Sequence, residues 1–111
     1  MDEHQKERLA RNEDAFRSVN EEIQGAAALH GSDSHEYDFL CECSDAACTE
    51  QVRLTLAQYE HVRADPTRFV VTKGHVTTEI EAIVETARDH VLIEKHGRAA
   101  EVVIKLDEAN E

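Results

Sequence analysis

The chain has 111 residues, the length of one domain, and its 41% hydrophobic content is enough for a small core. Its formal net charge of −12 disfavours contact with nucleic-acid phosphates or anionic lipids, and favours solubility or a basic protein partner. The sequence has no run of about 18 apolar residues, so we predict no membrane-spanning segment. Because the charged N-terminus lacks the apolar core of a secretory signal, we expect a cytoplasmic protein.

Residues 3–29 predict one long helix, because apolar or small residues recur along it at helical spacing. We expect this stripe to pack on the chain's own core. The alternative is a homodimer or a partner protein docked through Leu9, Phe16, Val19 and Ile23. The repeat spans fewer than three heptads, which is too short for a predicted coiled coil. The full stripe consists of Leu9, Asn12, Phe16, Val19, Ile23 and Ala26.

The middle of the chain predicts short strands and one helix after a polar loop at residues 31–36. Residues 37–40 and 51–54 alternate as strands do. Thr55 and Gln58 form a capping-box pattern, which predicts a helix that ends near Asp65, before Pro66. Residues 68–72 are aromatic and β-branched and give the clearest strand prediction of the sequence.

The last third of the chain fits two patterns. Thr78 and Glu81 resemble a capping box, and apolar residues follow at helical spacing, so we predict a helix over residues 79–88. The competing interpretation is a hairpin strand that pairs with residues 91–95. Residues 98–107 suit a helix or a strand equally.

All three cysteines lie within eight residues, at Cys41, Cys43 and Cys48. Thiolates select zinc, and structural zinc sites have four ligands, commonly four cysteines or three cysteines and a histidine. Cysteines two apart on an extended chain face the same side, and the small residues before Cys48 permit a tight turn. An odd number of cysteines without a signal sequence also indicates a reducing compartment. We therefore predict one zinc ion bound by these thiolates.

The fourth ligand must come from elsewhere, and a histidine is the expected type. His75 follows a glycine at the end of the clearest predicted strand, where the chain can return to the cysteine loop, so we predict His75. His61 falls in the middle of a helix on a face expected to be exposed. The rivals are His35, His61, His90 and His96, with Asp45 as an oxygen ligand.

Two other interpretations of the cysteines agree less well with the sequence than zinc does. Buried, unliganded cysteines are disfavoured because the segment is polar and flanked by acids. A redox switch would need a strained Cys41–Cys43 disulfide and would leave Cys48 without a disulfide partner.

A catalytic zinc needs an open position for water. Neither the His-Glu-x-x-His pattern nor the zinc-deaminase pattern is present, so we predict no catalytic residues.

Three stretches resemble a family of small, uncharacterised bacterial proteins that is common in actinobacteria. They are residues 11–21, residues 39–50 around the cysteines, and residues 54–71 with the following Gly74-His75. The resemblance implies that Cys41, Cys43, Cys48 and His75 form one zinc-binding motif, and it brings no established activity. This chain has Ser44 where such proteins often carry glycine, and it lacks their Asp-Gly-like turn near residue 89.

These observations predict an α+β protein, with a long N-terminal helix followed by a small zinc-stapled sheet and short helices. We expect residues 1–30 to form the amphipathic helix and residues 31–111 to form the zinc-binding domain. The predicted function is a non-enzymatic protein-interaction or regulatory domain. The alternatives are a zinc- or oxidant-responsive thiol switch and, third, a small enzyme with an open zinc held by three cysteines.

Overall fold

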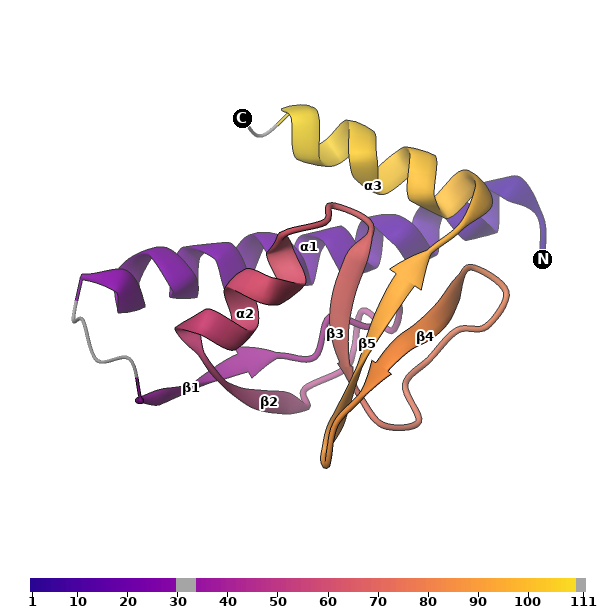
Figure 1. The fold of residues 1–111 in the computed structure, drawn as a ribbon. Helices are drawn as coiled ribbons and strands as arrows, with labels where there is room; N and C mark the ends of the chain where they lie inside the picture. The colour runs from indigo at the N-terminus through magenta and orange to yellow at the C-terminus, as the bar shows by residue number, and fades with distance from the viewer. Residues whose placement is uncertain (30–33, 110–111) are drawn as a thin grey trace.

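The first element of the structure, a computed structural model that describes residues 1–29 and 34–109, is the predicted long helix. Helix α1 (Glu3–Ala28) spans the length of the molecule (Figure 1). It begins at Asp2, whose carboxylate accepts a hydrogen bond from the Gln5 N–H at 2.7 Å. Residues 31–33 of the predicted polar loop lie outside the described residues.

Two short strands and a capped helix follow, as predicted. Strands β1 (Glu36–Leu40) and β2 (Gln51–Thr55) pair antiparallel, with Phe39 opposite Val52. The Thr55 hydroxyl accepts from the Gln58 N–H at 3.2 Å, and the Gln58 side chain accepts from the Thr55 N–H at 2.8 Å. This reciprocal capping box begins α2 (Leu56–Arg63).

The second sheet has the strand order β3-β5-β4, with antiparallel neighbours. It consists of β3 (Arg68–Thr72), β4 (Glu81–Thr86) and β5 (His90–Lys95). The helix predicted over residues 79–88 is wrong, and the competing hairpin is confirmed. Glu81 does not complete a capping box with Thr78, because its carboxylate accepts from the Thr77 N–H at 2.9 Å and pairs with buried Lys95. Pairing with β5 outweighs the helical spacing.

Residues 98–107, which suited either a helix or a strand, lie within helix α3 (Gly97–Ala109). Gly97 has φ +58°, a left-handed conformation that glycine adopts without strain, and it turns the chain from β5 into the helix. Helix α3 then runs beside α1 (Figure 1). Its Ala99, Val102 and Val103 are buried.

Strands β3 and β5 lie between two hydrophobic cores, and each face of these strands contributes side chains to one of them. Phe69 and Val71 face a core that also contains Cys41 and Cys43. Val70, between them, faces a second core that contains Phe39, Leu54, Tyr59, Val62 and Leu92. Alternate side chains of a strand point to opposite faces, which explains this division. The cysteines therefore adjoin the core that packs against α1 and α3.

The buried face of α1 is mostly polar, which the predicted apolar stripe did not anticipate. Leu9, Phe16 and Ile23 are only half-buried along the margins of the helix interface, and Val19 is 43% exposed. The fully covered positions lie beside the stripe and are Ala10, Glu13, Asp14, Arg17, Asn20 and Ala27. The helix thus packs on its own chain chiefly through side chains that form specific polar contacts.

The most deeply buried of these contacts joins three charged groups. Lys95 pairs with both Glu13 and Glu81, and all three side chains are 0% exposed. Burial raises the pKa of Glu13 well above its ordinary value, opposed by the Lys95 ammonium and assisted by Glu81. Two carboxylates around one ammonium thus favour retention of a proton by Glu13.

The α+β architecture predicted from the sequence is confirmed: a long N-terminal helix precedes two small antiparallel sheets with short helices. Among the described residues, none of the helices is both long enough and apolar enough to cross a lipid bilayer.

Candidate metal centre

The first two cysteines lie on an extended segment that passes from one sheet to the other. Cys41 follows β1 directly, and its N–H donates at 3.0 Å to the carbonyl of Glu50, the residue directly before β2. The next N–H, of Glu42, donates to the Val70 carbonyl of β3 at 2.8 Å. Cys41 and Cys43 therefore share one side of a segment that is fixed by backbone hydrogen bonds to both sheets.

Cys48 is brought back by the tight turn that the small residues predicted. The Asp45 carboxylate accepts from the Ala47 N–H at 2.9 Å, and the Asp45 carbonyl accepts from the Cys48 N–H at 3.0 Å. Such Asx turns reverse the chain within a few residues. A hydrogen bond between the hydroxyls of Ser44 and Thr77, 2.6 Å apart, joins this turn to the segment that follows β3.

His75 comes from the turn after β3. Its N–H donates to the Thr72 carbonyl at 3.0 Å, and Gly74 adopts φ +88°, a conformation that other residues rarely tolerate. The Thr72 N–H donates to the Cys41 sulfur at 3.2 Å. The end of β3 therefore supplies both a candidate ligand and a hydrogen bond to a second one.

These elements bring Cys41, Cys43, Cys48 and His75 together. Their sulfur atoms and one imidazole nitrogen all lie within 4.8 Å of one another, so the group could hold a metal ion. His75 Nδ1 is 3.6 Å from the Sγ atoms of both Cys41 and Cys48. Cys41 and Cys43 are buried, whereas Cys48 and His75 are half-buried. Cys43 and His75 also line a surface hollow of about 280 Å³.

The rival ligands lie elsewhere or are engaged otherwise. The His35 ring packs against Tyr37, with centroids 4.4 Å apart. His61 is exposed, as predicted, and bonds to a carboxylate of β4. His90 lines a separate cleft, and His96 is exposed. The Asp45 carboxylate accepts the Ala47 N–H within the cysteine turn. Among the described residues, only the predicted four gather into a possible metal-binding group.

The two buried cysteine thiols, Cys41 and Cys43, differ in acidity. The pKa of Cys41 is lowered to about 5, chiefly by a hydrogen bond from the Cys43 thiol and also by the Thr72 N–H, although burial acts against this. The same thiol–thiolate bond, together with burial, raises the pKa of Cys43. The Cys43 thiol thus stabilises the thiolate form of Cys41 as a neighbouring S–H donor.

Glu42, between the first two cysteines, points to the opposite side and is 0% exposed. One carboxylate oxygen accepts from the Tyr59 hydroxyl at 2.6 Å and from the Asn20 amide at 3.0 Å. The other accepts from the Val70 N–H at 3.0 Å and lies 3.7 Å from the Arg63 guanidinium. These contacts anchor the segment that carries the two buried thiols.

Helix α1 holds both ends of this segment. The Asn20 amide accepts from the Leu40 N–H at 2.8 Å and donates to the Leu40 carbonyl at 2.9 Å. Two turns earlier, the Asn12 amide donates to the Ser44 carbonyl at 2.9 Å. Asn12, the one polar member of the predicted stripe, therefore positions the cysteine turn.

Sequence reasoning missed the supporting role of Glu42, although a signal existed. If Cys41 and Cys43 face one side of an extended segment, residue 42 must face the other. In a chain with 24 acidic residues, however, an acid near a cysteine is not distinctive by itself. The partners Asn20 and Tyr59 come from two different helices, and local sequence patterns do not reveal them.

Comparison of the chain with protein-family models, curated proteins and solved structures gave no match.

Proposed function

We propose that this chain is a zinc-stabilised domain in which Cys41, Cys43, Cys48 and His75 bind one structural zinc ion. The single observation that supports this most is the gathering of all four donor atoms within 4.8 Å. Three thiolates and one imidazole form a common ligand set of structural zinc sites. Their 3.6 Å sulfur–nitrogen separations also agree with the edge of about 3.6 Å that tetrahedral zinc bond lengths give.

The position of the ligands supports a structural role for the metal. The metal would join the segment after β1 to the turn after β3, and so tie the two sheets together. Four protein ligands complete a tetrahedral shell and leave no open position for a substrate water. A protein with 5% aromatic residues and no tryptophan has a small core, to which such a link adds stability. We accordingly propose a non-enzymatic role.

We further propose that the domain binds another protein. The net charge of −12 favours a basic partner surface, and Val19 gives α1 an exposed apolar position. Affinity capture with the zinc-loaded chain from its native host should recover a stoichiometric basic partner, and the neutral variant Val19→Ser should bind that partner more weakly. Recovery of no such partner, with a monomer in sedimentation, would remove this part of the proposal.

Cobalt substitution tests the ligand set directly. Co²⁺ bound by three sulfurs and one nitrogen in a tetrahedron gives intense visible bands and sulfur-to-metal charge-transfer bands. We expect both in the wild type, with weaker charge transfer in Cys48→Ser. Octahedral cobalt spectra, or identical spectra for the two proteins, would contradict the proposed ligand set.

A redox response of the same centre is a second candidate, favoured by the partial exposure of Cys48 and by the surface hollow that Cys43 and His75 line. Oxidation of a ligand thiolate by peroxide would release the metal. Low equivalents of peroxide should then free zinc, which a chromogenic chelator measures. Thiols that stay unreactive in the folded zinc-loaded protein would exclude this candidate.

A further inference from the structure

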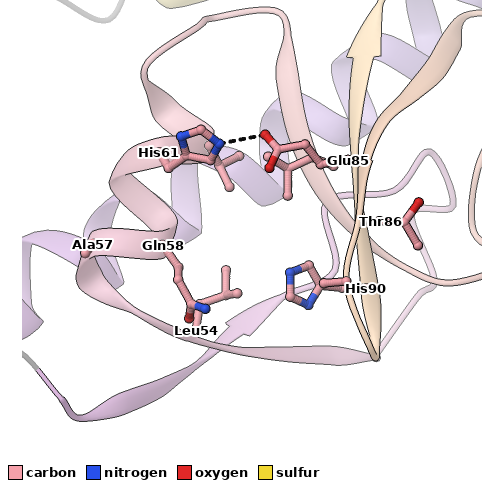
Figure 2. Close-up of a pocket in the computed structure, with 10 residues that line it drawn as sticks. Leu54, Ala57, Gln58, His61, Glu85, Thr86 and His90 are labelled. Carbon is pink, nitrogen blue, oxygen red and sulfur yellow. Dashed lines mark hydrogen bonds and ion pairs between the residues drawn. The ribbon is translucent and has the colours of Figure 1, made fainter.

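A second candidate site lies outside the metal centre, between α2 and the β4–β5 hairpin (Figure 2). It is a cleft of about 360 Å³, which lies within the size range of pockets for small molecules. Leu54, Val62 and Leu92 line it, and all three belong to the second core. These three side chains form an apolar floor that is almost covered, at 1–6% exposure, and the exposed methyl groups of Ala57 and Ala87 complete the apolar lining on which a flat apolar group can lie.

Polar groups occupy the rim of the cleft. His61 of α2 and Glu85 of β4 meet across one end, with His61 Nε2 2.6 Å from Glu85 Oε2 (Figure 2). His90 extends into the cleft from the start of β5, across from Gln58. Burial lowers the pKa of His90, so its neutral imidazole is available as a hydrogen-bond donor and acceptor.

The charge of the lining indicates the charge of the ligand. Glu85 is the one carboxylate among the ten lining residues, and none of them is a lysine or an arginine. His61 engages Oε2 of Glu85, and the described residues provide no hydrogen bond to Oε1. The net charge of −12 adds a field that attracts cations.

We propose that this cleft binds a small aromatic molecule that carries a protonated amine. The ring lies over this floor and contacts the methyl groups of Ala57 and Ala87, and the ammonium group donates to Glu85 Oε1. His90 and Gln58 contact polar substituents on the ring. A larger and more polar hollow of about 540 Å³ shares Gln58 and His90, and it gives room for substituents beyond the ring.

Three probes with the same ring and different charges test this assignment: benzylamine, benzyl alcohol and benzoate. Each is titrated into the metal-loaded ¹⁵N-labelled protein, and amide and imidazole shifts are followed. We expect millimolar binding of benzylamine, with shifts concentrated at His61, Glu85 and His90. Its affinity should exceed that of benzoate about five- to tenfold, as a half-exposed ion pair predicts.

Two variants separate the ring contact from the charge contact. Glu85→Gln keeps the shape of the rim and should bring benzylamine to the affinity of benzyl alcohol. Ala57→Phe fills the cleft from the exposed side of α2 and should abolish binding of all three probes. Glu22→Gln, on the surface of α1, is the matched control and should leave every affinity unchanged.

The result that would overturn the proposal is equal or tighter binding of benzoate, because it would place an anion site in the neighbouring hollow with Arg53 and Arg88. Absence of shifts at the cleft with all three probes, in a protein whose spectrum shows it to be folded, would overturn it as well. Unchanged charge preference in Glu85→Gln would contradict the assigned role of that carboxylate.

Discussion

Replacement of Glu42 by glutamine tests how the two buried thiols are held. The variant preserves the volume of the side chain and replaces one acceptor oxygen by an NH₂ donor. In one orientation of the glutamine amide, this donor faces the Val70 N–H. In the other it faces the NH₂ group of Asn20, which cannot turn away because the Asn20 amide bonds to both the N–H and the carbonyl of Leu40. Either orientation forces two donors to face each other in the interior.

The magnitude follows from these contacts. One unsatisfied buried donor costs about 1–3 kcal/mol, and loss of charge from the remaining bonds adds about 1 kcal/mol. The lower desolvation of a neutral amide offsets part of this sum. We therefore expect Glu42→Gln to lower the free energy of unfolding by about 3 kcal/mol. With a typical urea dependence of about 2 kcal/mol per molar, the midpoint falls by about 1.5 M.

The assay is urea unfolding followed by circular dichroism in excess zinc, so that loss of metal does not limit the comparison. Tyr59→Phe is the matched control, because it removes one donor and keeps the ring stacked on Phe39 at 4.4 Å. It should cost about half as much as Glu42→Gln. A Glu42→Gln variant within about 0.5 kcal/mol of the wild type would refute the anchoring role of Glu42.

Three further substitutions test the buried contacts of Lys95, Glu13 and Phe69. Lys95→Met should lower the free energy of unfolding by about 3–5 kcal/mol, measured by urea unfolding at pH 7, because it leaves two carboxylates buried together. Because the pKa of Glu13 is raised in the folded protein, its contribution to the free energy of unfolding is largest below its ordinary pKa of 4.5. That contribution is lost as the pH rises through the pKa that Glu13 has in the folded protein. Glu13→Gln should abolish that decline, so the variant gains on the wild type between pH 4.5 and pH 8 in matched thermal scans; parallel pH curves would contradict this. Phe69→Leu should cost about 1–3 kcal/mol in the same urea assay, because the Phe69 ring contacts Arg17, Arg63 and Lys95 at 4.9–5.3 Å from its centroid, and an unchanged midpoint would exclude these cation contacts.

The elements that the sequence predicted best have a local cause. The capping box at Thr55 and the β-branched residues of β3 act within a few residues, and both predictions agree with the structure. The cysteine spacing is also a local signal. His75 was predicted because Gly74 indicated a turn at the end of a strand, and that turn does bring its imidazole to the cysteines.

The parts that the sequence did not predict depend on contacts between distant residues. Ile80, Ile83 and Val84 satisfy helical spacing, and only pairing with β5 makes this segment a strand. The polar face of α1 likewise has no local signal, since Glu13 is buried by Lys95, which lies 82 residues further along the chain. A charged residue at a helix position is expected to be exposed unless its partner is known.

Metal content tests the central claim most directly. The wild type, His75→Ala and the exposed-histidine control His96→Ala are purified without added metal, and zinc per chain is measured together with thermal unfolding. We expect one zinc per chain in the wild type and in His96→Ala, and loss of zinc with loss of cooperative unfolding in His75→Ala. Full zinc retention in His75→Ala, or a wild type that binds no metal when zinc is supplied, would contradict the proposed four-ligand centre.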